Sequence, residues 1–327
     1  MMRLLSVELT RLRWRRAIVV LLVACIAVPL IMLAGFAWST RPFSEADIAE
    51  AKQLAAQEAQ QPYIAEEIAR CEQDPENYTG PGATAADCTE ALTPTYQNYL
   101  YRQEFTLTSL RTDVGAAAII IMTGLMMLVG TTFVGHDWNT GSMSNQLLFE
   151  PRRLRVWWAK GLAVMLVGAV VGAAVLATFW AGASLVAASR DVRVEPGLWS
   201  TIVETQARGV VAIALGGLLG LALTMLFRST VATLSLMFGI SIAGSLLIMT
   251  VLGEEGTRWL LPTNFLAFVL GGFTYYDGSA CSFSPDGMTS GDCERHVSAM
   301  DGGVVLAVIV VVAVLLSVWS MRRRDVP

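Results

Sequence analysis

Few residues of this chain carry side chains that could do chemistry. The 327 residues include two histidines, His136 and His296, and two lysines, Lys52 and Lys160. Neither lysine lies in the glycine-rich phosphate loop G-x-x-x-x-G-K-[ST], so the chain has no nucleotide-binding motif of its own. Two separated histidines do not assemble a metal site or a Ser/His catalytic set. We therefore expect no enzymatic activity and no metal or cofactor bound by this chain.

The composition indicates that this chain resides in a lipid bilayer. Hydrophobic residues make up 54% of the sequence and charged residues 15%, against roughly 25% charged residues in an average soluble domain. Six apolar stretches are long enough to cross the bilayer as helices, at residues 17–38, 113–134, 161–188, 209–227, 229–252 and 302–321. A soluble protein with six buried helices is the alternative. It predicts amphipathic stripes, which these stretches lack.

The first apolar stretch begins after five arginines and therefore resembles a signal peptide. Residues Ala17 to Trp38 are nevertheless long enough for a complete span. The residues that follow, up to Arg41, lack the small-residue A-x-A pattern of a cleavage site. We therefore predict an uncleaved first span.

The charges between the spans predict the orientation of the chain. If the N-terminus is cytoplasmic, the inner segments hold 13 of the 23 basic residues and four of the 27 acidic residues. Short loops with an excess of Lys and Arg face the cytoplasm. We therefore predict a multi-pass membrane protein with both termini in the cytoplasm.

Four of the five cysteines fall in predicted outer segments, Cys71 and Cys88 in one and Cys281 and Cys293 in another, whereas Cys25 lies in the first span. Disulfides form in oxidising compartments, so we predict the bonds 71 to 88 and 281 to 293. Four unrelated thiols are the alternative, because sequence alone does not establish connectivity.

The cytoplasmic loop at residues 135–160 predicts a short helix against the inner membrane surface. Ser142 can cap this helix, which ends near Glu150, and Pro151 breaks it. The chain also begins with a basic amphipathic helix within residues 1–16, which carries three leucines on one face: Leu5, Leu9 and Leu12.

This loop resembles that of ABC-2 exporter permeases, which reads as an acidic residue, a Gly-Thr or Gly-Ser turn, Leu-Leu, and Pro-Arg before Ala-Lys. The matching positions are Asp137, Gly141, Ser142, Leu147, Leu148, Pro151, Arg152, Ala159 and Lys160. The neighbouring Arg153 is predicted to belong to the same coupling segment. The resemblance implies a coupling helix that docks on a separate ABC ATP-binding subunit, which holds ATP and Mg. It also implies a second permease subunit, identical or related, no nucleic acid, and a place in the inner membrane of a bacterial cell. Leu261 to Asn264 resembles the motif near the family's outer re-entrant hairpin.

The transport path is predicted from adaptable and polar side chains within the spans. The candidate residues are Met122, Met126, Thr131, Ser241, Met249 and Phe265. Methionine adapts to irregular apolar shapes, which favours a hydrophobic or amphipathic cargo such as a drug, lipid or peptide. Ordinary helix packing is the alternative for each residue. The span cores hold no Asp, Glu or His, which disfavours an ion-coupled carrier.

Two glycine pairs, Gly168 with Gly172 and Gly216 with Gly220, have the spacing of close helix contacts, within one subunit or between two.

Two outer segments interrupt the spans. Residues 39–112 predict an extracytoplasmic helical domain, because Ser44 and Asp47 form a capping box before a helix at 45–60. Within it we expect a loop at 75–86 and a helix at 96–111. Residues 253–301 predict an outer loop whose apolar part, 259–273, forms a re-entrant hairpin broken at Pro262.

Together these features predict an all-α integral membrane protein with six transmembrane helices. The remaining segments are a cytoplasmic interfacial helix at 1–16, an outer loop at 189–208 and a cytoplasmic tail at 322–327. The expected function is the permease subunit of an ABC-2 type exporter. The alternative is a membrane-anchored sensor or immunity protein that acts through its outer domain without transport.

Overall fold

The computed structural model describes residues 2–80, 82–278, 281–283, 289–290 and 293–323. Within this part of the chain, six helices are long and apolar enough to cross a membrane, as predicted. They are α2 (Arg16–Ser39), α8 (Ala116–Asn139) with the preceding turns from Leu107, α10 (Arg153–Ser189), α11 (Leu198–Phe227), the stretch Thr230–Leu270, and α15 (Ala299–Arg323). Residues 324–327 of the predicted tail lie outside the described residues.

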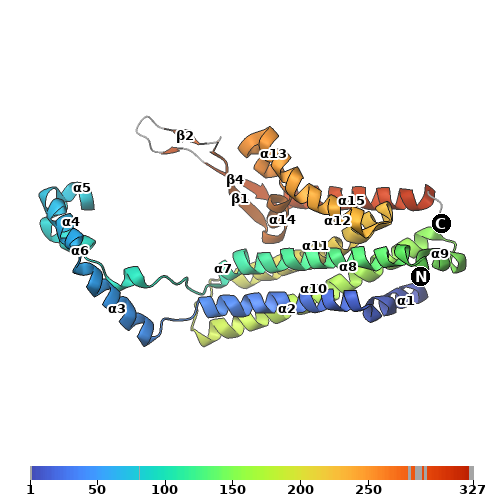
Figure 1. Cartoon of the computed structure of the whole chain (residues 1–327), viewed down its shortest axis with the longest axis horizontal. Coiled ribbons are helices and arrows are strands. Elements are labelled where there is room, and N and C mark those ends of the chain that lie inside the picture. Colours follow the sequence, from blue (N-terminus) through green and yellow to red (C-terminus); the bar gives the residue numbers. More distant parts are fainter. Residues whose placement is uncertain (1, 81, 279–280, 284–288, 291–292, 324–327) are drawn as a thin grey trace. The chain divides into compact units, whose positions relative to one another are not determined.

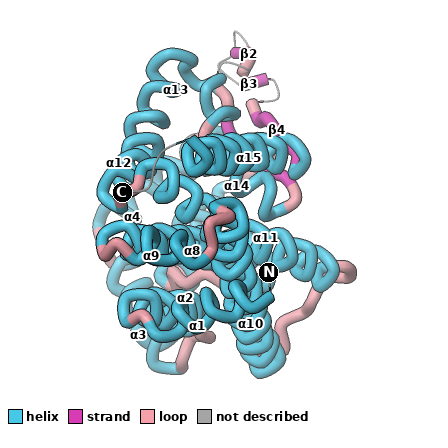
Figure 2. Tube along the Cα trace, turned by 90° about the vertical axis from the view of Figure 1, so that its right-hand side faces the viewer, coloured by secondary structure: helices cyan, strands magenta, loops and turns pink. Residues whose placement is uncertain are grey.

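The chain forms two compact units. The first contains Met1–Gly35 and Thr106–Pro327, and the second contains Phe36–Phe105. The first unit holds the long helices, with α11 packed against α8, α10, α14 and α15. Figure 2 looks nearly along these helices and shows α8 and α11 between α10 and α15.

Close contact between α8 and α11 depends on glycine. A Cβ added to Gly220 would lie 2.1 Å from the Met127 carbonyl oxygen, and one added to Gly130 would lie 2.1 Å from the Gly217 carbonyl oxygen. A Cβ added to Gly168 on α10 would lie 3.2 Å from the Ala214 Cα of α11. The predicted use of the glycine pairs in helix contacts is therefore confirmed within one subunit.

One end of the first unit gathers three segments from distant parts of the chain, and we call it the basic end because two of them, α1 (Met2–Trp14) and the last turn of α15, carry arginines. It consists of α1, α9 (Ser142–Phe149) and the last turn of α15, which lie together in Figure 1. Helix α1 is the predicted amphipathic helix: Leu12 is buried, and Leu5 and Leu9 pack against the core. The first and last described residues, Met2 and Arg323, therefore both lie at the basic end, on the side that the charge distribution predicts to be cytoplasmic.

The opposite end of the first unit differs from the prediction in two ways. Pro262 does not break a hairpin but lies in the first turn of α14 (Leu261–Leu270). Backbone N–H groups in the first turn of a helix have no intrahelical acceptor, so the missing N–H of proline costs no hydrogen bond there. Gly271, with a φ of 94°, ends this helix. The all-α prediction is also wrong here, because β1 (Gly272–Tyr276) pairs antiparallel with β4 (Glu294–Ser298).

The aromatic and β-branched residues of β1 favour a strand over a helix. A second short pair, β2 (Ser282–Phe283) with β3 (Thr289–Ser290), lies between the two longer strands in sequence. The disulfide from Cys281 to Cys293 closes this segment, as predicted.

The second unit is a helical domain held by one disulfide. Its elements are α3 (Glu45–Ala59), α4 (Pro62–Gln73), α5 (Pro75–Thr79), α6 (Ala85–Leu92) and the 3₁₀ turn Tyr96–Tyr99. The capping box of Ser44 and Asp47 is present, and hydrogen bonds from Ser44 lower the pKa of the Asp47 carboxyl. Cys71 and Cys88 are fully buried and bonded, which confirms the second predicted disulfide.

Two local predictions for the second unit are wrong. The segment 75–86 is not all loop, because Pro75 opens α5 and Thr84 caps α6. The segment 96–111 is not one helix, because residues 100–106 are non-helical before helix resumes at Leu107. Thr106 caps that restart by accepting a hydrogen bond from the Ser109 N–H, so the second span begins there.

Candidate functional site

A cluster of buried charges lies at the basic end. The Lys160 ammonium of α10 is fully buried and donates to Glu8 Oε2 at 2.9 Å and to Asp137 Oδ2 at 2.6 Å. Both carboxylates are also fully buried. Arg15, at the break between α1 and α2, pairs with the other oxygen of Asp137 and donates to the Phe133 carbonyl. The two buried acids are thus paired with Lys160, with Arg15 and, at 3.7 Å from Glu8 Oε1, with the partly exposed Arg11. Such pairing is the condition for holding charges away from water.

The same cluster is connected to α9 through one side chain. Gln146 donates to Glu8 Oε1 at 2.6 Å and accepts from Arg11 at 3.3 Å. Met143 of α9 is fully buried, and Leu147 packs against the core. Helix α9 is therefore attached to α1, and through Glu8 and Lys160 to α10 and α8.

Helix α9 keeps one apolar end in solvent. Leu148 is 80% exposed and Phe149 is 91% exposed, although both lie in the last turn of the helix. Adjacent exposed apolar side chains outside a span mark a contact surface. This pair, which we call the α9 tip, extends from an element whose other face is anchored in the core.

The structure brings some of the predicted coupling residues together and separates others. Gly141 has a φ of 68° and occupies the N-cap position of α9, so Ser142 is the first helical residue and not its cap. Pro151 and Arg152 are exposed beyond the helix end. Arg153 donates to the Met321 carbonyl at 3.1 Å and so joins α10 to the end of α15. Asp137 lies apart from these residues, inside the buried cluster.

The predicted path residues do not meet in one cavity among the described residues. Met122, Met126 and Thr131 are buried in the packed core around α8. Ser241 and Met249 lie on the exposed face of the Thr230–Leu270 stretch. The last of the six, Phe265, is partly buried against the core. In this structure the three α8 residues are packed in the core, and their role in a transport path stays a prediction.

Sequence reasoning missed Glu8, Arg15, Gln146 and Phe149 as members of the site. Glu8 had a detectable signal, because it lies three residues after Leu5 and four before Leu12, on the apolar face of α1. An acid in that position requires a buried partner. The sequence near Glu8 does not indicate that Lys160 is its buried partner, because Lys160 follows 152 residues later.

The fold and site define a mostly helical protein with six helices long and apolar enough to cross a membrane and a buried charge cluster at one end. No protein-family model matches the chain, and neither a curated protein nor a solved structure gives a match. The resemblance to ABC-2 permeases therefore rests on residues of the chain itself.

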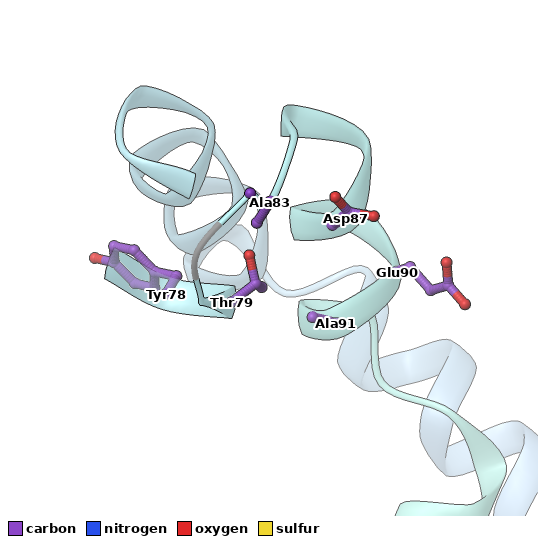
Figure 3. A pocket seen from close by; sticks show the side chains of 7 residues that line it. Tyr78, Thr79, Ala83, Asp87, Glu90 and Ala91 are labelled. Atoms are coloured by element: carbon purple, nitrogen blue, oxygen red, sulfur yellow. The ribbon is translucent and has the colours of Figure 1, made fainter. Parts of the chain in front are cut away.

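The second unit carries a hollow of its own. A cavity of about 580 Å³ lies between α5 and α6, and its lining includes Tyr78, Thr79, Asp87 and Glu90 (Figure 3). Asp87 is committed to the cap of α6, where hydrogen bonds from Thr84 lower the pKa of its carboxyl. The described residues that line this hollow include no basic side chain.

Proposed function

We propose that this chain is the membrane-spanning permease subunit of an ATP-driven exporter of the ABC-2 type. It would sit in the bacterial cell membrane with both termini in the cytoplasm and move a hydrophobic or amphipathic substrate outward. ATP and Mg would be held by a separate ABC ATP-binding chain. The observation that carries this proposal is α9, with an exposed apolar tip and a buried, charge-linked base.

A partner that receives Leu148 and Phe149 in a pocket gains about 1.5–3 kcal/mol for each apolar side chain fully buried. Motion of that partner would then reach α1 through Gln146 and α10 through Lys160. Packed side chains and buried ion pairs transmit displacement because interiors have low compressibility. The contacts around α9 thus support a role in receiving force.

A second permease subunit suits the face of the fifth span. The 18-residue apolar window within Thr230–Leu270 has no residue buried inside the chain. Its exposed side chains include Val231, Phe238, Leu246 and Val251. Lipid tails or an identical helix face would cover such a surface equally well in chemical terms, so this face is compatible with a homodimer or a pairing with a related permease and does not by itself favour either over lipid.

The test is copurification from native membranes followed by identification of the bound chain. We expect an ATPase with a G-x-x-x-x-G-K-[ST] loop to copurify with the wild type. Replacing both tip residues, Leu148→Ser with Phe149→Ser, should reduce its recovery at least about tenfold, since two buried apolar contacts are lost. Leu54→Ser, which changes an exposed leucine of α3, is the matched control and should leave recovery unchanged.

If no such ATPase accompanies the wild type, or the double variant retains it fully, the permease assignment is wrong. The second candidate, a sensor or immunity protein, is favoured by the separate disulfide-closed unit and its hollow. It predicts that activity in cells survives the α9 tip changes and is lost when Tyr78 and Glu90 are both replaced by Ala.

A further inference from the structure

A second cavity lies at the basic end, beside the charge cluster. Its volume is about 590 Å³, and it is bounded by the junction of α1 and α2, the last turns of α8 and the start of α12 (Thr230–Gly239). The junction is the single non-helical residue Arg15, after which α2 begins at Arg16. The cavity is therefore formed where the chain turns from a surface helix into its first apolar span.

The chemistry of the lining favours an anion. Arg15, Arg16 and His136 line the cavity, and Thr132, Asn139 and Thr230 add polar groups. None of the described residues that line it is a carboxylate. The Arg15 guanidinium is held by Asp137 and the Phe133 carbonyl, so its charge is balanced and its position is fixed. Among the described residues, Arg16 has no acidic partner, and its charge is available to a ligand.

One part of the lining is apolar and places the cavity at a particular depth. Trp14 is 77% exposed directly before the span, a position where tryptophan marks the membrane interface. Ile18 and Ala17, in the first turn of α2, continue the wall from the charged residues toward the apolar span. A ligand that fits both parts has an anionic group joined to a hydrocarbon chain.

We infer that this cavity binds the headgroup of an anionic phospholipid, with the phosphate at Arg16 and the upper acyl carbons against Ile18. The inference requires α2 to span a bilayer but does not require an ATPase partner. A bound lipid would contact α12 through Thr230 and the α1–α2 junction through Arg16, and so would join two elements of the first unit.

The experiment measures lipid binding to the purified full-length chain by native mass spectrometry. Phosphatidylglycerol and phosphatidylcholine with identical acyl chains are titrated separately. We expect the anionic lipid to bind at least about fivefold more tightly, and Arg16→Gln to lower that affinity about fivefold, the contribution of one arginine near a lipid surface. Arg13→Gln is the matched control, because Arg13 is exposed in the last turn of α1 and does not line the cavity.

Three outcomes would overturn the inference. Equal binding of the two lipids would show that charge is not recognised, and this comparison needs no variant to fold. An equal loss with Arg13→Gln and Arg16→Gln would assign the effect to the general charge of the surface. Complete displacement of phosphatidylglycerol by millimolar inorganic phosphate would assign the cavity to a free anion.

Discussion

At the scale of single residues, Lys160 is the centre of the buried charge cluster. Its ammonium is the shared partner of Glu8 and Asp137, and all three side chains are fully buried. Forming such a cluster costs desolvation free energy that the mutual attraction only offsets, so the cluster need not add net stability. Removing one member is a different matter, because the remaining charges stay buried without their counterpart.

Lys160→Met should therefore lower the free energy of unfolding by about 3–5 kcal/mol, since it removes the one fully buried cation that contacts both carboxylates and leaves them with Arg15 and the partly exposed Arg11. Lys52→Met is the matched control, because Lys52 is the other lysine of the chain and is exposed on α3. Thermal unfolding of the purified protein in one detergent measures both. Similar midpoints for the two variants would contradict the buried cluster, and adding Glu8→Gln to Lys160→Met should recover part of the loss.

At the scale of elements, the contact between α8 and α11 depends on the absence of side chains. Gly220→Ala places a methyl group 2.1 Å from a backbone oxygen of α8, and backbone cannot rotate away as a side chain can. We expect a loss of about 1–3 kcal/mol in unfolding free energy, as for other overpacked sites. The same thermal measurement checks it.

Gly239→Ala in α12 is the control for helix propensity. A Cβ at Gly239 meets nothing within 4 Å, so alanine there should be neutral or stabilising by about 0.5–1 kcal/mol. Destabilisation of both variants by the same amount would show that the α8–α11 distance is not set by glycine.

The elements that sequence predicted well are those whose cause is local. Apolar length specifies a span, and Ser44 with Asp47 specifies a helix start within four residues. The strand pair was missed because β1 is stabilised by a partner that begins at Glu294, on the far side of a disulfide-closed segment. Pro262 was misread because proline is compatible both with a break in a helix and with the first turn of a new helix. The sequence alone does not tell which of these two positions the proline occupies, whereas the structure places it in the first turn of α14.

The candidate site was predictable only in part, for the same reason. The short helix near Ser142 followed from the turn at Gly141 and the break at Pro151. The exposure of Phe149 depends on how α9 packs, and the cluster joins groups 23 and 152 residues apart. Pairing across such distances is a property of the folded helices and has no periodic signal in the sequence.

At the scale of the whole molecule, the two units have separate sources of stability. The first depends on packed helices, whereas the second is small and contains a buried disulfide between α4 and α6. Domains of this size bury a smaller fraction of their surface and gain more from a covalent link. Within the second unit, Phe36 and Phe105 lie with ring centroids 5.6 Å apart and so bring its two chain ends together.

Replacing Cys71 and Cys88 together by serine should cost the second unit about 3 kcal/mol, the chain-entropy value for a loop of this length. Hydrogen exchange read by mass spectrometry should show lost protection in α4 and α6 and unchanged protection in α8 and α11. Thr89→Ser, an exposed change on α6, is the control. Full protection of α4 and α6 in the double variant would contradict this account.

The distance along the chain between Glu8 and Lys160 also determines an order of events during synthesis. Helix α1 leaves the ribosome first, whereas its ammonium partner is made 152 residues later. Until α10 has been translated and inserted, Glu8 has only the partly exposed Arg11 of its own helix as a cationic partner, and it cannot enter the interior without a large desolvation cost. The first helix of the chain is therefore among the last to reach its final position, and a nascent chain that ends before residue 160 holds it only at the surface.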